Sequence, residues 1–179
     1  SDIKKTKNRI SGDITTYKMP EFTYTEIDEP EDWIVAESLM KKFILKDKTP
    51  DFSKIKIFLS DVDGVLTDAG MYYTENGDEF KKFCTYDGMG FQLLQETGVK
   101  VGILTTEDRE LNRRRAKKLG LDFDFHGAKD KLQIVKDLCE KENISLDEIA
   151  YIGDDVNCFE LLSNAGTSAC PMNAVSKIK

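Results

Sequence analysis

The most informative stretch of the chain is IKIFLSDVDGVLTD, residues 55–68. It begins with a short apolar run, 55–59, whose length is typical of a buried strand. Two aspartates follow this run, Asp61 and Asp63, and Gly64 then allows the chain to turn away sharply. The stretch therefore predicts a buried strand with two carboxylates beyond its carboxyl end.

Short apolar runs and helical patterns alternate along the rest of the chain. Further strands are expected at 99–104, 123–125, 149–152 and 167–169, and helices at 88–97, 107–119, 129–142 and 157–163. Strands that alternate with helices favour parallel βαβ units. The predicted fold class is therefore α/β, a Rossmann-like parallel sheet with helices on both faces.

A β-hairpin is expected between the first strand and the first helix. Residues 71–74 and 79–83 flank Asn76 and Gly77, and both of these residues tolerate the positive φ of a type I′ turn. A two-stranded ribbon that carries aromatic side chains needs further packing, so the sequence predicts a homo-oligomer. The aromatic residues are Tyr72, Tyr73, Phe80 and Phe83.

The composition limits the possible functions. The chain has 179 residues, with 26 Lys and Arg against 33 Asp and Glu, and a formal net charge of −7. An acidic chain is a poor general binder of nucleic acid, because phosphate backbones favour positive surfaces. No apolar run approaches the roughly 18 residues of a membrane helix, and the N-terminus has no apolar signal core. We therefore expect a cytoplasmic protein without nucleic-acid or membrane partners.

Histidine and cysteine usage restricts the metal chemistry. His126 is the only histidine, which excludes sites built from several histidines. The four cysteines have no CxxC spacing and are expected to be reduced thiols. Any metal site should therefore be built from oxygen ligands.

The composition changes near residue 50, which predicts an N-terminal segment, 1–50, and a regular α/β domain, 51–179. The first segment holds three of the four prolines and the only tryptophan. Residues 30–45 favour a helix, because Pro30 fits a first helical turn and Asp32 suits its positive N-terminal end. This helix has an apolar stripe but too little partner surface to fold alone.

Polar side chains follow the carboxyl ends of several predicted strands. Ligands bind beyond these ends in open α/β sheets, so the side chains should converge on one rim. They are the carboxylates of Asp61, Asp63, Asp154 and Asp155, the hydroxyl of Thr105 and the ammonium of Lys131.

The expected cluster has a chemical interpretation. Carboxylates that lie close together need a cation, and oxygen ligands favour Mg²⁺. An aspartate bound to Mg²⁺ can attack phosphorus, and a second aspartate can donate a proton to the leaving oxygen and then activate water. A hydroxyl and an ammonium can hold the phosphoryl oxygens. Taken singly, Thr105 is also a plausible helix cap, Lys131 a solvated lysine and Asp154 a turn residue.

Residues 54–179 resemble the haloacid dehalogenase superfamily of phosphatases. The stretch 58–67 is similar to the first motif of that family, and 103–105, Lys131 and 153–155 are similar to the second, third and fourth motifs. The family often has a further aspartate where this chain has Cys158. The resemblance implies that Asp61 is the nucleophile, Asp63 the general acid/base, Thr105 and Lys131 the phosphate ligands, Asp61, the Asp63 carbonyl and Asp154 the Mg²⁺ ligands, and Asp155 a supporting carboxylate.

The absence of an inserted cap domain narrows the resemblance. Residues 61–171 are similar to the small capless phosphatases of 3-deoxy-octulosonate 8-phosphate and of nonulosonate 9-phosphates. The resemblance implies a tetramer in which hairpins and C-terminal tails help to close neighbouring sites. This chain is expected to lack the Gly-rich tail that is usual in these phosphatases.

The octulosonate enzymes usually have Thr-Gly-Arg at the second motif, whereas residues 105–107 are Thr-Thr-Glu, which is similar to the nonulosonate type. That likeness implies that Glu107, Arg115 and Lys118 bind a sugar acid such as KDN or N-acetylneuraminate 9-phosphate. A plainer interpretation of Arg115 and Lys118 is a solvated basic helix face.

Residues 17–40 resemble the C-terminal end of sialic-acid cytidylyltransferases, in which an aspartate at the position of Asp28 helps to hold Mg²⁺. The nucleotide-binding body of those enzymes has no counterpart in the sequence, so the resemblance implies a fragment of a fused synthetase–phosphatase. A plainer interpretation is a chance helix that begins with Pro-Glu-Asp.

Three functions follow as hypotheses. The first is an Mg²⁺-dependent sugar-acid phosphatase that forms an aspartyl phosphate. The second is a parent cytidylyltransferase in which this domain serves chiefly in oligomerisation, and the intact set of carboxylates argues against that role. The third is a phospho-accepting receiver domain, which does not require a second aspartate at the position of Asp63.

Overall fold

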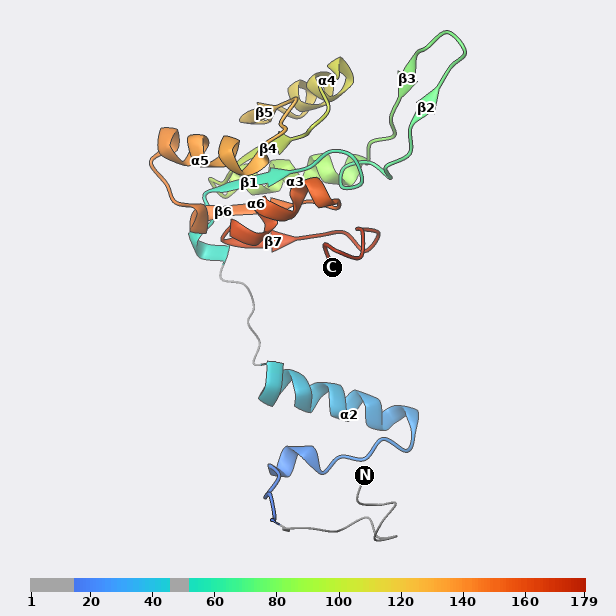
Figure 1. Ribbon diagram of the computed structural model, residues 1–179, viewed down its shortest axis with the longest axis vertical. Helices are drawn as coiled ribbons and strands as arrows, with labels where there is room; N and C mark the ends of the chain where they lie inside the picture. Colours follow the sequence, from blue (N-terminus) through green and yellow to red (C-terminus); the bar gives the residue numbers. More distant parts are fainter. Residues whose placement is uncertain (1–14, 46–51) are drawn as a thin grey trace, which may run out of the picture. The chain divides into compact units, whose positions relative to one another are not determined.

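The computed structural model describes residues 15–45 and 52–179 (Figure 1). These two ranges belong to separate units of the chain. In neither range is there a helix that is long and apolar enough to cross a membrane.

The N-terminal unit consists of short helical elements. These are the 3₁₀ turn η1 (Glu21–Thr23), the helix α2 (Pro30–Met40) and the π-helical turn η2 (Lys41–Leu45). The predicted helix is confirmed: Pro30 occupies its first turn, and Glu29 and Asp32 form a reciprocal capping box. No residue of α2 is buried. The likeness of this unit to the C-terminal end of cytidylyltransferases stays a prediction.

The second unit contains one five-stranded parallel sheet with the strand order β5-β4-β1-β6-β7. The strands are β1 (Ile57–Ser60), β4 (Lys100–Leu104), β5 (Phe123–Phe125), β6 (Ile149–Ile152) and β7 (Thr167–Ala169). The chain proceeds from β1 outward to β4 and β5 on one side, and then to β6 and β7 on the other. This reversal makes β1 the switch point of the sheet. The predicted Rossmann-like α/β class is confirmed.

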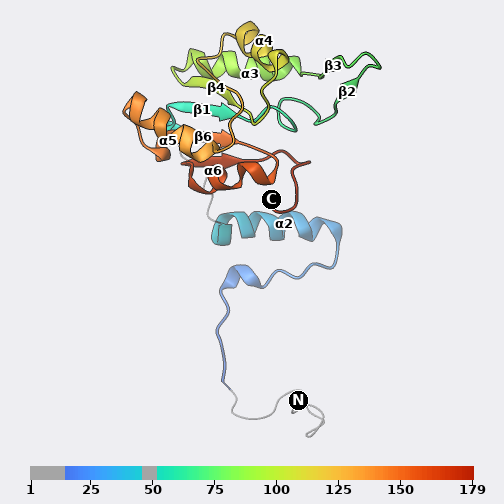
Figure 2. The same cartoon turned by 45° about the horizontal axis from the view of Figure 1, so that its top comes forward.

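Four helices cover the two faces of this sheet (Figures 1 and 2). They are α3 (Thr85–Glu96), α4 (Glu110–Leu119), α5 (Lys131–Glu142) and α6 (Phe159–Asn164). Successive side chains of a strand point to opposite faces. Accordingly, Leu59 packs with residues of α5 and α6, whereas Phe58 packs with residues of α3 and α4. The two cores therefore share the central strand.

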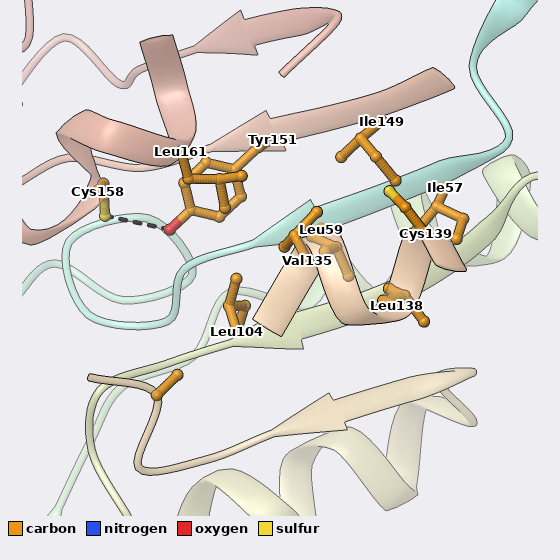
Figure 3. Close-up of a cluster of buried hydrophobic side chains, with 11 residues drawn as sticks. Ile57, Leu59, Leu104, Val135, Leu138, Cys139, Ile149, Tyr151, Cys158 and Leu161 are labelled. Atoms are coloured by element: carbon orange, nitrogen blue, oxygen red, sulfur yellow. Dashed lines mark hydrogen bonds between the residues drawn. The ribbon is translucent and has the colours of Figure 1, made fainter. Parts of the chain in front are cut away.

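The larger of the two cores lies between the sheet and helices α5 and α6. Figure 3 shows its side chains from β1, β6 and α5 turned toward one another, among them Leu59, Ile149 and Val135. One polar contact lies at its edge, where the Tyr151 hydroxyl donates a hydrogen bond to Cys158 Sγ at 3.1 Å. Apolar burial on this scale fixes the position of β1 and β6, and with it the residues that follow them.

The hairpin is confirmed as β2 (Tyr72–Tyr73) paired antiparallel with β3 (Glu79–Phe80). The prediction of a type I′ turn is wrong. Among the described non-glycine residues only Ala69 and Asn143 have positive φ, so Asn76 does not, while Gly77 has φ +87°. The Gly77 N–H donates to the Thr74 carbonyl at 3.0 Å, so this turn needs one left-handed residue, and glycine adopts that conformation most easily.

The helix boundaries differ from their predictions: the helix expected at 88–97 begins at Thr85, and the one expected at 157–163 begins with the 3₁₀ turn η5 (Val156–Cys158) before α6. Two further differences have a cause in side-chain contacts. The helix expected at 107–119 begins at Glu110, so Glu107 lies in the preceding loop, where its N–H donates to Thr105 Oγ1 at 3.2 Å. The helix expected at 129–142 begins at Lys131, because the Asp130 carboxylate caps it by accepting from the Gln133 N–H at 2.9 Å. Side-chain contacts of the loops therefore set where these helices start.

Leu59→Ala should lower the free energy of unfolding of the second unit by about 2–5 kcal/mol, because a fully buried side chain would leave a cavity. Urea unfolding followed by circular dichroism measures the loss. The control is Leu93→Ala on α3, which is 54% exposed and should cost less than about 0.5 kcal/mol. Equal costs at the two positions would contradict the core described above.

Candidate active site

A pocket of about 260 Å³ lies beyond the carboxyl ends of β1, β4 and β6. It is the place at which an α/β sheet of this topology binds ligands. The structure brings together here most of the residues that the sequence singled out. The pocket is lined by Asp61, Asp63, Ala69, Met71, Thr105, Thr106, Glu107, Asp154, Asp155 and Asn157.

Asp61 and Lys131 form a buried ion pair in the site. Asp61 follows β1, its N–H donates to the Ile152 carbonyl at 2.9 Å, and it is 5% exposed. The Lys131 ammonium, at the start of α5, donates to Asp61 Oδ2 at 2.5 Å, and Lys131 is 3% exposed. The Val62 N–H donates to the other carboxylate oxygen at 2.7 Å. Both oxygens of Asp61 are thus fixed by partners from two elements.

A phenol and a thiol surround this ion pair. Lys131 Nζ lies 3.2 Å from the Tyr151 hydroxyl and 3.3 Å from Cys158 Sγ, and the thiol donates to Asp61 Oδ2 at 3.0 Å. Burial raises the pKa of Tyr151 and of Cys158, so both groups stay neutral. The sequence analysis did not count Cys158 as a site residue and missed Tyr151. The apolar strand pattern around Tyr151 predicts only that it is buried in the core.

Asp154 lies against the turn that follows β1. Gly64 has φ +80°, and a Cβ at this position would lie 1.8 Å from Asp154 Oδ2. Glycine is therefore required at residue 64 both for the backbone conformation and for the space that the carboxylate fills. Burial raises the pKa of Asp154, and the nearby Asp61 carboxylate raises it further.

Asp63 is bound by a lysine that the sequence analysis did not identify. Lys81 Nζ donates to Asp63 Oδ1 and Oδ2 at 2.7 and 2.9 Å, and also to Glu107 Oε2. Burial raises the pKa of Asp63, against the opposing effect of Lys81. Burial alone would lower the pKa of Lys81, but the hydrogen bonds to both carboxylates outweigh it and raise it. Lys81 is therefore a permanent cation of this site.

Glu107 lines the pocket, whereas Arg115 and Lys118 do not. The Arg115 guanidinium donates to the Cys84 carbonyl at 2.7 Å and lies 5.3 Å from the centre of the Phe83 ring. Lys118 is exposed on α4. Within one chain the structure therefore does not join these two cations to the predicted substrate residue Glu107, and their binding role stays a prediction.

The carboxylates fit a divalent cation. One ligand atom each of Asp61, Asp154 and Cys158 lies within 4.8 Å of the others. Burial raises the pKa of Asp154 and the neighbouring Asp61 carboxylate raises it further, and a cation shared by the two carboxylates would offset their repulsion. Carboxylate and carbonyl oxygens are the ligands that Mg²⁺ prefers. The Cys158 thiol is neutral, so the oxygen ligands determine the fit.

Gly64→Ala should weaken Mg²⁺ binding by about ten- to hundred-fold, the range typical of changes beside a metal ligand. The added methyl group would take the place of the Asp154 carboxylate. Isothermal titration calorimetry with Mg²⁺ measures the affinity, and circular dichroism verifies the fold. Gly90→Ala, where a Cβ meets no atom within 4 Å, should bind Mg²⁺ as the unmodified chain does. Unchanged affinity in Gly64→Ala would remove Asp154 from the metal site.

Comparison with known proteins agrees with this geometry. Residues 85–166 match the family model of haloacid dehalogenase-like hydrolases. The chain is 34% identical over 125 residues to the 3-deoxy-D-manno-octulosonate 8-phosphate phosphatase of Haemophilus influenzae, over 70% of this chain and 69% of that protein. It is 33% identical over 120 residues to the enzyme of the same name from Escherichia coli K12, over 67% and 64% of the two chains.

The fold is similar to that of a solved phosphatase that has the same name as these two relatives. The 3-deoxy-D-manno-octulosonate 8-phosphate phosphatase of Moraxella catarrhalis, in complex with a magnesium ion, a phosphate ion and KDO, has a TM-score of 0.69 and 35% identity. The similarity covers 72% of this chain and 74% of that one. This chain belongs to the haloacid dehalogenase-like hydrolases, and within them to the sugar-acid phosphatases related to the 3-deoxy-D-manno-octulosonate 8-phosphate phosphatases.

Proposed function

We propose that the chain is an Mg²⁺-dependent phosphatase that releases the 9-phosphate of a nonulosonate, such as KDN or N-acetylneuraminate, through an aspartyl phosphate on Asp61. The observation that supports this most strongly is the buried pair of Asp61 and Lys131 at the pocket that Asp63 also lines. A carboxylate that accepts a phosphoryl group needs a fixed cation close by, because negative charge gathers there. The sugar-acid phosphatases among the relatives support the reaction class.

The reaction would proceed in two steps. An oxygen of Asp61 attacks phosphorus, the bond from phosphorus to the sugar oxygen breaks, and the Asp63 carboxyl gives its proton to the leaving oxygen. Asp63 then takes a proton from water, the water oxygen attacks phosphorus, and the bond to Asp61 breaks. Phosphate leaves and both carboxyl groups return to their first state. The raised pKa of Asp63 suits a group that must hold a proton in the first step.

Three further residues are assigned to the phosphoryl group and the cation. Lys131 would offset phosphoryl charge, and the Thr105 hydroxyl, which lines the pocket, would bind a phosphoryl oxygen. Asp61, the Asp63 carbonyl and Asp154 would hold Mg²⁺, which when bound offsets the negative charge of the phosphoryl group and of the carboxylates.

Glu107 is the main support for a nonulosonate as the substrate. It lines the pocket, and a carboxylate accepts hydrogen bonds from sugar hydroxyls. Octulosonate enzymes usually have arginine at this position, which would instead donate hydrogen bonds. The two types of enzyme should therefore prefer different groups at the sugar end of the substrate.

Arg115 and Lys118 enter the proposal through a second copy of the chain. If α4 of a neighbouring copy faces the pocket, these cations can pair with the carboxylate of the sugar acid. A homo-oligomer, with four copies as in the related enzymes that the sequence resembles, is therefore part of the proposal. The exposed side chains of Tyr72, Tyr73 and Phe80 on the hairpin support association.

Asp61→Asn should abolish phosphate release, because an amide is a poor nucleophile. The unmodified chain should release phosphate from nonulosonate 9-phosphates and p-nitrophenyl phosphate with Mg²⁺, and excess EDTA should stop it. A colorimetric phosphate assay measures both effects, and mass spectrometry after acid quenching detects phosphate on the chain. Full turnover in EDTA, or a phosphorylated Asp61→Asn chain, would contradict the proposed mechanism.

Lys118→Ala should lower kcat/KM for a nonulosonate 9-phosphate roughly ten- to hundred-fold, because a lost charge-assisted hydrogen bond costs about 1.5–3 kcal/mol. Hydrolysis of p-nitrophenyl phosphate, which has no carboxylate, should barely change. Lys117→Ala, an exposed neighbour on the same helix, is the matched control. Equal losses on both substrates would mean that Lys118 supports the fold or the phosphate site rather than the sugar acid.

A further inference from the structure

Lys81 connects two carboxylates of the pocket that have different tasks in the proposed reaction. Its ammonium donates to both oxygens of Asp63 and to one oxygen of Glu107, and its side chain has no exposed surface. Two of these contacts go to the oxygens of one carboxylate, which lie too close together for two separate N–H groups of a tetrahedral ammonium, so they share one donor. The charge of the lysine is therefore offset by Asp63 and Glu107 within the chain itself.

The position of Lys81 is fixed by a second ion pair beside it. Glu79, two residues earlier on the same arm of the hairpin, pairs with Arg109 at 3.4 Å. Arg109 lies two residues after Glu107, the partner of Lys81. Both pairs join the base of the hairpin to the loop after β4, with opposite polarity. The lysine is thus held by its backbone segment as well as by the carboxylates that it binds.

The charges around Asp63 show what the ammonium does. Lys81 Nζ donates to the carboxylates of both Asp63 and Glu107, and so holds the two like charges together. Like charges in a partly buried pocket move apart when nothing lies between them. Removal of Lys81 would leave Asp63 and Glu107 without their shared cation, so the Asp63 carboxyl would lose the contacts that fix both of its oxygens.

We propose that Lys81 is a positioning residue of the phosphatase reaction, which holds the Asp63 carboxyl in place for proton transfer to the leaving oxygen and ties it to Glu107. This inference rests on the proposed function. It assigns the hairpin a part in proton transfer, because the arm that follows β3 supplies the lysine. Direct binding of the substrate carboxylate by Lys81 is the alternative, and the lack of exposed surface on the Lys81 side chain argues against it.

The test is a series of phosphate monoesters whose leaving groups differ in pKa, from p-nitrophenyl phosphate to simple alkyl phosphates. The value of kcat/KM reports the steps up to and including the departure of the alcohol, to which Asp63 gives its proton. A good leaving group needs little help from an acid, whereas an alkoxide needs much. In Lys81→Met, kcat/KM for p-nitrophenyl phosphate should fall less than about threefold, and kcat/KM for alkyl phosphates about ten- to hundred-fold. The second loss is a part of the roughly 10²–10⁴-fold acceleration that general acid catalysis contributes.

Two variants separate this role from a structural one. Lys82→Met changes the exposed neighbour and should leave the dependence on leaving-group pKa unaltered. Lys81→Arg keeps a cation and should restore part of the rate with alkyl phosphates. Thermal unfolding of each variant verifies the fold. A defect of the fold lowers kcat/KM for every ester alike and leaves the slope against leaving-group pKa unchanged.

Each outcome decides between defined possibilities. A steeper slope in Lys81→Met, with partial rescue by arginine, supports the inference. An unchanged slope overturns it, whether the rates fall uniformly or not at all. A loss confined to esters that carry a carboxylate, whatever their leaving group, overturns it in favour of substrate binding. If the unmodified chain with Mg²⁺ released phosphate from none of these esters, the proposed function would fail, and the inference would fail with it.

Discussion

An ammonium and a carboxylate that are both removed from water must stay together, and Asp61 and Lys131 are such a pair. Breaking a buried pair by removing one partner costs about 3–5 kcal/mol, because the other charge is left uncompensated. Asp61 directly follows the central strand and Lys131 begins α5, 70 residues later in the chain. The pair therefore joins β1 to the helix that covers it, at the rim where Thr105 and Asp154 also lie.

The neutral groups around this pair decide how its charge is distributed. The position at which related phosphatases often have another aspartate is occupied by Cys158, and burial keeps both this thiol and the Tyr151 phenol protonated. In the ion pairs of the described residues, Lys131 has Asp61 as its carboxylate partner. A second carboxylate, at residue 158, would share the ammonium and weaken its effect on Asp61. The thiol and the phenol instead connect the two charged groups by hydrogen bonds without adding charge.

The sheet and most of the pocket could be predicted because both follow from local patterns. Apolar runs that alternate with helical patterns define a parallel sheet, and residues that follow its strands must meet at one edge, as Asp61, Thr105 and Asp154 do. Lys81 could not be found in this way. It reaches the pocket through a long side chain from the base of a hairpin, and only the tertiary structure places that segment beside the loop of Glu107. The start of α4 was predicted too early as well, because the contact between the Glu107 N–H and the Thr105 hydroxyl keeps Glu107 in the loop before the helix.

The two ion pairs between the hairpin and the loop after β4, Glu79 with Arg109 and Lys81 with Glu107, have a consequence for protein engineering. Exchanging the hairpin of this chain for that of a related phosphatase would replace Glu79 and Lys81 but leave Arg109 and Glu107, so each remaining charge would depend on whatever the donor sequence supplies. The same holds for exchange of the loop alone. The hairpin and the loop after β4 must therefore be exchanged together, although they are separate in sequence. Attempts to change substrate preference by recombination among these enzymes should treat them as one unit.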